Sequence, residues 1–458
     1  MFELIGNIGY YAFAFVLALG PLVAVHEWGH FWVARKLGVR VLRYSVGFGK
    51  PLWRRIGRDG TEYVVAAIPL GGYVKMLDER EGDVPADQVH QAFNRQGVWT
   101  RIAIVAAGPG VNLLFAVFAF WLMFMIGISG YEPRMGEPEP GTAAERAGIR
   151  AGELIVAVNG EEVRSWNDAQ AEIVKGVLDD GRARLEVLDD GGLVRERLVD
   201  LGIQAREREP QRLLDGLGLS AYVPAYDLKV TYLEEGDPAQ RAGLELGDII
   251  RSIDGRELST MRDLIRAVQA HPGKDLSFRV ERDGMLRSFT VRPKAVEEGQ
   301  RVVGKIGLGS RPPEGLMEPY RVEVRFGPIE ALGRAGEQTW NNAVFMVSML
   351  GRLVSGQISL QHISGPLRIA ELAGLVAKQD LSRFLRLLAI LSLTLGIMNL
   401  LPVPVLDGGH LLYYLIELVR GAPLSEQAQW FGQRLGIAIL LGVMSLAFYN
   451  DLISIFGG

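Results

Sequence analysis

The sequence predicts a multi-pass α-helical membrane protein with four transmembrane helices, a membrane-associated β segment and two similar extracytoplasmic α+β domains. Three observations predict it: four long stretches without charge, a glycine-rich pattern that occurs twice, and one segment of alternating apolar and polar residues. Hydrophobic residues make up 48% of the 458 residues and charged residues 22%, which indicates membrane spans joined to a large water-exposed part. The net charge of −4, with both signs mixed, predicts no nucleic-acid partner.

The first apolar stretch has no charged residue from Leu4 to Val25. Its 22 residues would form a helix of about 33 Å, enough to cross a hydrocarbon core of about 30 Å. The stretch lacks the basic start and small-residue cleavage site of a signal peptide, so we expect a retained span. Three further spans are predicted around Ile102–Tyr131, around Leu387–Leu406 and in the short stretch that ends before Asp451.

Basic residues predict the orientation of the spans. Many Lys and Arg residues lie between 35 and 101, whereas the two chain ends have none, so the 35–101 segment is expected in the cytoplasm. Both termini and the long 132–380 stretch are then expected outside, and the 407–430 link inside.

The outer stretch contains an internal repeat. "GTAAERAGIRAGELIVAVNGEEVRSWNDAQ" from Gly141 aligns without a gap with "GDPAQRAGLELGDIIRSIDGRELSTMRDLI" from Gly236. Each copy predicts a short helix closed by glycine, a strand ended by an Asn-Gly or Asp-Gly turn, and a second helix. The pattern resembles the PDZ domain, in the strand-permuted form found in bacterial envelope proteases. The alternative is a small β domain that serves as a spacer.

Two segments outside the repeat have weaker patterns. Residues 38–98 alternate apolar and polar positions between Gly-rich turns, which predicts two or three strands in a cytoplasmic or membrane-reentrant region. Residues 313–380 have apolar positions at helical spacing, so this segment is expected to lie on the membrane surface or to pack on the repeated domains.

The motif "HEWGH" follows the first apolar run. A helix places His26 and His30, four residues apart, on one face, where their imidazoles can bind one metal ion. Glu27 is next to the first histidine and can take a proton from a metal-bound water, the arrangement of the HExxH zinc hydrolases. The chain has no cysteine, so any metal is held by His, Asp or Glu. The alternative is a pair of histidines that cap a membrane helix, although an ionisable trio in a span is costly without a use.

A catalytic zinc site needs a third protein ligand. Asp407 and His410, in "MNLLPVPVLDGGH", lie at the end of the third apolar stretch, at a depth similar to that of the HEWGH motif. Pro402 and Pro404 break the helix there, which implies a hydrated cavity. Asp407 could instead cap a loop, and for His410 a role in the loop or behind the ligands is favoured over ligation.

"HEWGH", "GFGK", "GGYVKM" and "NLLPVPVLDGG", in this order, resemble the site-2 protease family of intramembrane zinc metalloproteases. The resemblance covers essentially the whole chain. It implies that Asp407 is the third zinc ligand and that Asn399 binds substrate or stabilises the oxyanion; otherwise Asn399 would bond to the broken helix backbone. It also implies a membrane-reentrant hairpin in the β segment.

The hypothesis that follows is hydrolysis of peptide bonds in transmembrane segments, with one Zn²⁺ per chain and Glu27 as the proton acceptor. An unwound substrate could add as a strand to the edge formed by Gly47, Phe48, Gly49 and Lys50, unless these strands only fasten the first two spans. The resemblance implies single-span substrates of the anti-sigma-factor type that another protease has already trimmed, or signal-peptide remnants, at the bacterial inner membrane in the envelope stress response. The tandem PDZ pair would be periplasmic and act as a size filter.

Two rival functions are a membrane-anchored PDZ scaffold with an inert metal motif and a transporter with zinc in its path. No inverted repeat of the spans supports the transporter. Another divalent ion that prefers N and O ligands is the alternative to zinc.

The predicted divisions are residues 1–37, 38–98 and 99–131 (helix, β region, helix), 132–222 and 223–312 (PDZ domains), 313–380 (amphipathic segment), 381–410 (helix three), 411–427 (cytoplasmic link) and 428–452 (helix four).

Overall fold

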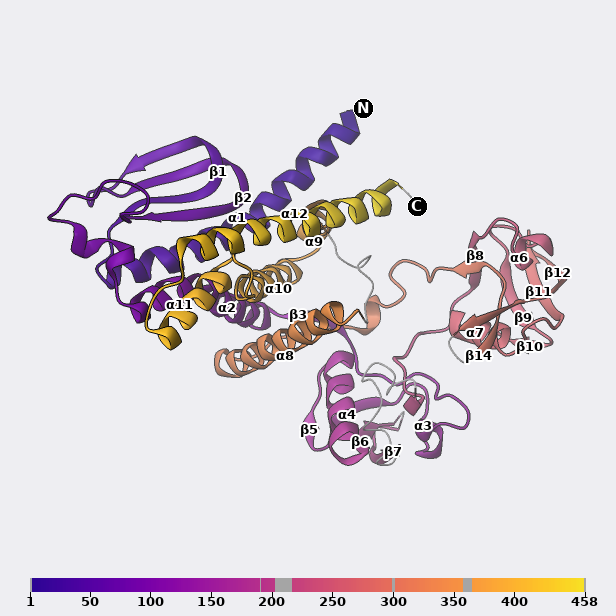
Figure 1. The fold of residues 1–458 in the computed structure, drawn as a ribbon. Coiled ribbons are helices and arrows are strands. Elements are labelled where there is room, and N and C mark those ends of the chain that lie inside the picture. The colour runs from indigo at the N-terminus through magenta and orange to yellow at the C-terminus, as the bar shows by residue number, and fades with distance from the viewer. Residues whose placement is uncertain (1, 190, 202–215, 299–300, 357–364, 457–458) are drawn as a thin grey trace. The chain divides into compact units, whose positions relative to one another are not determined.

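The computed structural model describes residues 2–189, 191–201, 216–298, 301–356 and 365–456 (Figure 1). The chain divides into two compact units, one formed by residues 1–128 with 325–458 and the other by residues 129–324. The first unit consists mainly of helices, and the second contains most of the strands.

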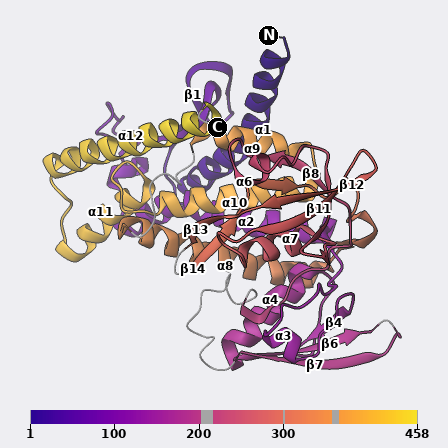
Figure 2. The same cartoon turned by 90° about the vertical axis from the view of Figure 1, so that its right-hand side faces the viewer.

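Among the described residues, four helices are long and apolar enough to cross a membrane, as the sequence predicted. They belong to the first unit, in which α2 contacts both α1 and α10. Figures 1 and 2 show α10 alongside α2 from two directions. Most of α12 is exposed in the structure, as expected for a helix that faces lipid. The four helices are α1 (Phe2–Lys36), α2 (Val98–Ile126), α10 (Leu381–Asn399) and α12 (Glu426–Phe456).

The prediction of one helix over residues 381–410 is wrong. Helix α10 ends at Asn399, and a separate helix, α11 (Asp407–Arg420), begins at Asp407 after a turn. Pro402 and Pro404 in that turn have no backbone N–H to continue the helix, and their rings clash with the preceding turn. The predicted cytoplasmic link at 411–427 is therefore largely helical, and α12 begins at Glu426.

The β segment is formed by two long strands, β1 (Val41–Ile56) and β2 (Glu62–Met76). Each bends back on itself, so residues 41–46 lie between residues 72–76 on one side and 62–65 on the other. The strands pack on α1: the Tyr44 hydroxyl donates to the Ala24 carbonyl at 2.7 Å, and Phe31 contacts the Tyr44 ring. Two short 3₁₀ turns, η1 (Val89–Gln91) and η2 (Phe93–Arg95), lead to α2.

The amphipathic segment forms α8 (Pro328–Val354) and α9 (Pro366–Ala377), both in the first unit. Helix α8 runs along α2 and reaches α10, where the Thr394 hydroxyl lies 3.7 Å from Met346 Sδ. Helix α9 packs on α1, and the Asp451 carboxylate of α12 accepts hydrogen bonds from backbone N–H groups at its start.

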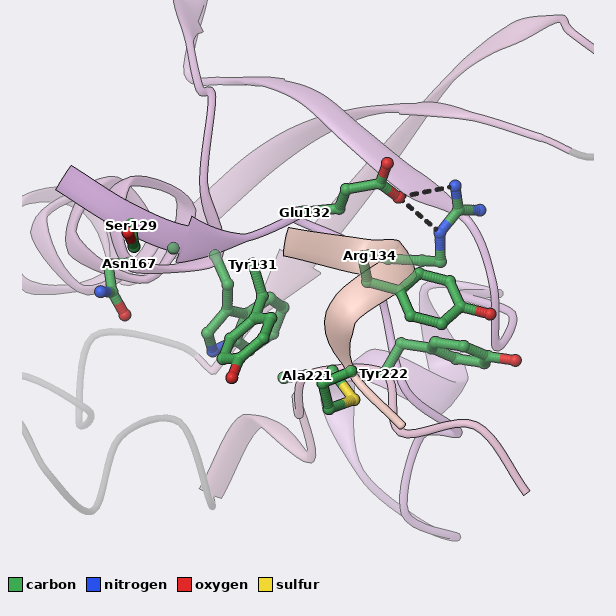
Figure 3. Close-up of a pocket in the computed structure, with 11 residues that line it drawn as sticks. Ser129, Tyr131, Glu132, Arg134, Asn167, Ala221 and Tyr222 are labelled. Atoms are coloured by element: carbon green, nitrogen blue, oxygen red, sulfur yellow. Dashed lines mark hydrogen bonds and ion pairs between the residues drawn. The ribbon is translucent and has the colours of Figure 1, made fainter. Parts of the chain in front are cut away.

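The first copy of the repeat forms a four-stranded sheet in the order β5-β4-β6-β7 with a helix packed on it. Asn159 and Gly160 both have positive φ, 53° and 85°, which confirms the predicted tight turn at the end of the strand. A cavity of about 180 Å³ lies beside this domain, lined by aromatic rings and the Glu132–Arg134 ion pair (Figure 3). The elements are α3 (Ala143–Arg146), β4 (Leu154–Val158), β5 (Glu161–Glu162), α4 (Trp166–Asp180), β6 (Arg182–Leu188) and β7 (Val194–Asp200).

The second copy forms a sheet in the order β12-β11-β9-β8-β15, with β10 paired to β9, and repeats the tight turn at Asp254 and Gly255. A pair of strands, β3 (Ile128–Tyr131) and β16 (Arg321–Val324), brings together the two ends of the second unit. The remaining elements are β8 (Leu228–Leu233), α6 (Pro238–Arg241), β9 (Ile249–Ile253), β10 (Arg256–Glu257), α7 (Met261–Gln269), β11 (Leu276–Arg282), β12 (Met285–Val291), β13 (Lys294–Glu298), β14 (Arg301–Lys305), β15 (Leu308–Ser310) and η4 (Glu318–Tyr320).

A buried acidic residue occupies the same position in both copies. Glu153 accepts from the Arg150 N–H and pairs with Arg197, and Asp248 accepts from the Glu245 N–H and pairs with Arg282. Both acids are at most 3% exposed. A buried carboxylate persists only when it is paired and hydrogen-bonded, so each pair fixes the turn before the central strand of its domain.

We predict that Asp248→Asn destabilises the second domain by about 1.5–3 kcal/mol, the usual value of a hydrogen bond to a charged group. Burial alone would raise the pKa of Asp248, but the hydrogen bonds from Arg282 outweigh it and hold that pKa below 3.8. The stability due to this ionised carboxylate is therefore full above pH of about 4 and is lost as the pH falls through the lower folded pKa.

Hydrogen exchange of β9 and β11 in the full chain, followed from pH 7 downwards, measures this effect. Asp275→Asn is the control because its ion pair with Arg292 is exposed, and it should change the exchange much less. Equal protection in the Asp248 variant and the parent chain at neutral pH would contradict the prediction.

Candidate metal centre

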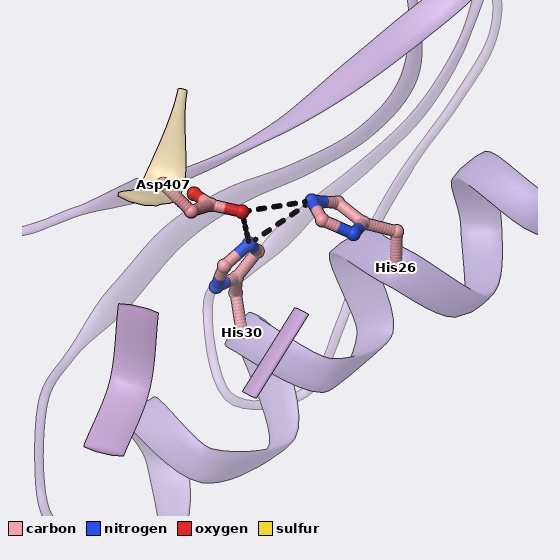
Figure 4. Close-up of side chains that lie close together, drawn as sticks. All are labelled: His26, His30 and Asp407. Carbon is pink, nitrogen blue, oxygen red and sulfur yellow. Dashed lines mark hydrogen bonds and ion pairs between the residues drawn. The ribbon is translucent and has the colours of Figure 1, made fainter. Parts of the chain in front are cut away.

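The HEWGH motif lies on α1, and its two histidines point to the same side of the helix (Figure 4). The Nε2 atoms of His26 and His30 are 3.3 Å apart, and both side chains are almost fully buried. The i, i+4 spacing therefore brings the two donor atoms together, as the sequence predicted.

Asp407 completes the group from the other end of the chain. As the first residue of α11 it directs its carboxylate at the two imidazoles, with Oδ2 3.2 Å from His26 Nε2 and 3.4 Å from His30 Nε2 (Figure 4). The three donor atoms form a nearly equilateral triangle whose centre is roughly 1.9 Å from each, close to the zinc–ligand distances of about 2.0–2.2 Å.

The surroundings of this triangle also fit a metal ion. Asp407 Oδ2 is buried and has no hydrogen-bond partner among the described residues. Gly108 of α2 faces the histidines so closely that a Cβ there would lie 2.2 Å from His30 Nε2. Two neutral imidazoles, a carboxylate and a space kept open by glycine make a donor set typical of zinc.

Two groups on α2 that the sequence analysis missed hold the imidazole rings from behind. His30 Nδ1 lies 2.9 Å from the Ile104 carbonyl, and His26 Nδ1 lies 3.2 Å from Asn112 Nδ2. Asn112 is fully buried. The sequence signal that could have indicated it is a polar residue within an apolar span.

A second missed feature fixes α11, and with it Asp407. Arg101 of α2 donates two hydrogen bonds to the Glu417 carboxylate, at 3.1 Å and 2.6 Å, and its guanidinium lies 4.8 Å from the centre of the Tyr414 ring. Both charged side chains are mostly buried. A bidentate pair of this kind fixes orientation as well as distance, so it sets the direction of α11 relative to α2.

Glu27 is buried beside the histidines and packs against the β segment. A Cβ added at Gly72 would lie 2.6 Å from Glu27 Cγ, which means that this residue of β2 touches the Glu27 side chain. Residues 72–76 pair with residues 41–46, and within the described strands they have no partner on their other side. The free strand edge next to Glu27 is therefore at residues 72–76.

The predicted edge from Gly47 to Lys50 lies at the bend of β1, next to that strand. The Phe48 ring stacks on the Tyr73 ring, with the ring centres 6.2 Å apart. A Cβ at Gly71 would clash with the Phe48 ring. Asn399 is the last residue of α10, just before the proline turn. His410 lies on α11 against Tyr413 and is not part of the metal-binding group formed by the described residues.

Comparison with known proteins gives the family. The sequence model of Peptidase family M50 matches residues 14–443 of this chain. The chain belongs to this family. It is 41% identical to a putative zinc metalloprotease of Vibrio cholerae serotype O1 and 40% identical to the regulator of sigma-E protease RseP of Escherichia coli, in each case over 96% of this chain and 97% of the relative. It is 42% identical to the regulator of sigma-E protease RseP of Salmonella typhimurium over the same shares.

These similarities confirm the predicted resemblance to the site-2 proteases and the prediction of an intramembrane zinc metalloprotease. With its four apolar helices, the chain is a multi-pass protein of the inner membrane. Among solved structures, the PDZ domain of an SdrC-like protein from Listeria innocua is 20% identical, covers 19% of this chain and 98% of its own, and has a TM-score of 0.17. A structure of the HtrA-type protease AlgW with a decapeptide is 18% identical, covers 29% and 50%, and has a TM-score of 0.15.

We predict that Gly108→Ala abolishes metal binding at this centre, because the added methyl group would overlap His30 Nε2. Zinc content of the purified protein measures it. Gly110→Ala is the matched control, since a Cβ at Gly110 meets nothing within 4 Å on the same helix. A Gly108→Ala protein that is folded and holds zinc like the control would contradict the prediction.

Proposed function

We propose that His26, His30 and Asp407 hold one zinc ion per chain and that Glu27 is the proton carrier of an intramembrane peptidase. The observation that supports this most strongly is the convergence of the three donor atoms, 3.2–3.4 Å apart, from opposite ends of the chain. Zinc at such a centre supplies Lewis-acid chemistry, which acidifies a water and polarises a carbonyl.

Glu27 has the position that proton transfer requires. Its carboxylate interacts electrostatically with His30 and Asp407, and contact with Gly72 limits its movement. In the proposed reaction Glu27 accepts the proton of the attacking water and then delivers it to the nitrogen of the leaving amine. Its side chain is almost fully buried, which keeps bulk water from competing for that proton.

Asn399 is proposed to bind the substrate backbone or to donate to the oxyanion. The helix ends at this residue, and the proline turn carries the chain on to Asp407 eight residues later. An amide at such a break is close in sequence to the metal ligand and is not needed for helix hydrogen bonding. A fixed N–H donor aimed at developing negative charge is the usual form of oxyanion stabilisation.

A substrate helix must unwind before its peptide bonds can be attacked, and a free strand edge can hold the unwound segment. The edge at residues 72–76 runs beside Glu27, and Gly47, Phe48, Gly49 and Lys50 flank it through the Phe48–Tyr73 stack. We propose that the substrate adds here as a strand, which presents its backbone carbonyls to the metal centre.

The proposed substrates are single-span membrane proteins of the anti-sigma-factor type, trimmed first by another protease, and remnants of signal peptides. Two relatives are named regulator of sigma-E protease, which supports a substrate that controls a sigma factor. Both termini and the two repeated domains would then be periplasmic. The two domains are proposed to be a PDZ pair that acts as a size filter, and the second has a groove of about 400 Å³ between α7 and residues 304–308.

We predict that Glu27→Gln keeps zinc but lowers cleavage of a single-span substrate by at least about 100-fold, since general-base catalysis contributes roughly 10²–10⁴-fold. The measurements are metal content and cleavage after reconstitution in vesicles. Removal of the metal with a chelator should stop cleavage by the parent chain, and added Zn²⁺ should restore it. Undiminished cleavage by the variant would remove Glu27 from the reaction. Absence of cleavage by the parent chain with zinc bound would make the anchored scaffold the better account.

We predict that Asn399→Ala lowers kcat about 10²–10³-fold, as the loss of one oxyanion donor does, while zinc content stays the same. Met398→Ala is the control because Met398 precedes it on α10 and its side chain is partly exposed. If both variants cleave at the parent rate, Asn399 has no part in the transition state.

A further inference from the structure

Asn112 is a polar side chain enclosed between helices. It lies on α2 and is fully buried, its backbone carbonyl accepts from the Ser392 hydroxyl at 2.8 Å, and Gly396 packs against its Cβ. Its Oδ1 atom is buried without a hydrogen-bond partner, while Nδ2 lies 3.2 Å from His26 Nδ1. A buried polar group with an unsatisfied atom is costly, so it needs an explanation.

The second histidine shows what a metal ligand requires on this side. His30 Nδ1 is 2.9 Å from the Ile104 carbonyl, which can only accept. Nδ1 therefore carries the proton, and Nε2 has a free lone pair toward the donor triangle. The backbone of α2 alone fixes His30 in the tautomer that can bind a metal.

His26 faces an amide instead of a carbonyl, and an amide can present either of two atoms. With Nδ2 toward His26, the amide donates to Nδ1, and the imidazole proton is then on Nε2, where it blocks ligation. A half-turn of the amide places Oδ1 there, so that Nδ1–H donates to it and Nε2 is free. Each orientation leaves one amide atom without a partner, so the amide alone does not select either one.

We propose that Asn112 is a positioning residue for the metal ligand His26: its Oδ1 accepts from Nδ1–H and holds His26 in the metal-binding tautomer. This rests on the metal centre proposed above. When a divalent ion takes the Nε2 lone pair, the proton must be on Nδ1, and the amide oxygen is the only acceptor that the described structure places there. Asn112 thereby does for His26 what the Ile104 carbonyl does for His30.

The test uses the purified full-length chain and measures Zn²⁺ affinity by competition with a chromogenic chelator. Asn112→Leu keeps the size of the side chain but removes both polar atoms, and it should weaken zinc binding about 10–100-fold. Asn112→Asp keeps an acceptor and should restore binding to within a few-fold of the parent. Ser392→Ala removes a neighbouring contact of α10 with α2 that does not touch His26, and it should leave affinity unchanged.

A spectroscopic readout separates positioning from a general loss of packing. With ¹⁵N-labelled histidine and zinc bound, His26 and His30 should both show the Nδ1–H tautomer in the parent chain. With zinc bound, the Nδ1–H proton of His26 in the Asn112→Leu variant should resonate upfield of its position in the parent chain because it has lost its acceptor, while the His30 Nδ1–H proton, bonded to the Ile104 carbonyl, should not move. If the Leu variant does not fold, the Asn112→Asp variant tests the proposal: it should keep the Nδ1–H hydrogen bond of His26, and loss of that bond would contradict the proposal.

Parent-like zinc affinity of Asn112→Leu, or equal losses in Asn112→Leu, Asn112→Asp and Ser392→Ala, would overturn the proposal. His26→Ala distinguishes this from failure of the metal centre itself. If His26→Ala loses zinc and Asn112→Leu does not, only the role of Asn112 fails. If His26→Ala binds zinc like the parent chain, the proposed ligand set fails as well.

Discussion

The first unit depends on one constraint: two imidazoles from the first helix and a carboxylate from the last third of the chain must meet at a point within an apolar helix bundle. An unpaired carboxylate removed from water costs several kcal/mol, so a carboxylate of Asp407 buried 3.2 Å and 3.4 Å from two imidazole nitrogens is the arrangement expected around a cation. The helix break before Asp407 meets this requirement, since a helix that continued past Asn399 would not begin anew with Asp407 directed at the histidines. The prolines that end α10 are therefore as necessary to this meeting point as the three side chains themselves.

Helix α2 is the scaffold for this meeting point. Arg101 forms an ion pair with α11, and the Ile104 carbonyl contacts His30. Gly108 leaves space in front of the imidazoles, and the Asn112 amide contacts His26. The four residues recur at helical spacing, so they lie on one face of α2. Close approach is possible because small residues line the contacts; a Cβ at Gly29 of α1 would be 2.5 Å from the Ala107 carbonyl. In a membrane, where the hydrophobic effect does not drive helices together, such close packing and the polar contacts between helices stabilise the assembly.

The β segment connects the metal centre to a backbone edge. The hydrogen bond from Tyr44 to the Ala24 carbonyl fastens the strands to α1 two residues before the HEWGH motif. Gly72 then touches Glu27, and a larger residue would push the strand away from the carboxylate. The free edge and the Glu27 side chain are in this way held at a fixed separation by two contacts on the same helix.

The spans, the histidine pair and the strand ends of the repeats could be predicted from the sequence alone, because the interactions that decide them are local or periodic. The lengths of uncharged sequence predicted the four spans, because hydropathy decides them. Helical spacing predicted that His26 and His30 lie together, because the pitch of a helix is fixed. The Asn-Gly and Asp-Gly pairs predicted where the strands of both repeats end, because these residues tolerate positive φ. The strand edge beside Glu27, the Arg101–Glu417 pair and the contact of Asn112 with His26 could not be predicted, because they join residues far apart in the sequence. The sequence predicted that Asp407 lies near the histidines only from their similar depth in the membrane and from the family resemblance. Only the tertiary structure decided it, because a distance between helices is set by how their side chains pack.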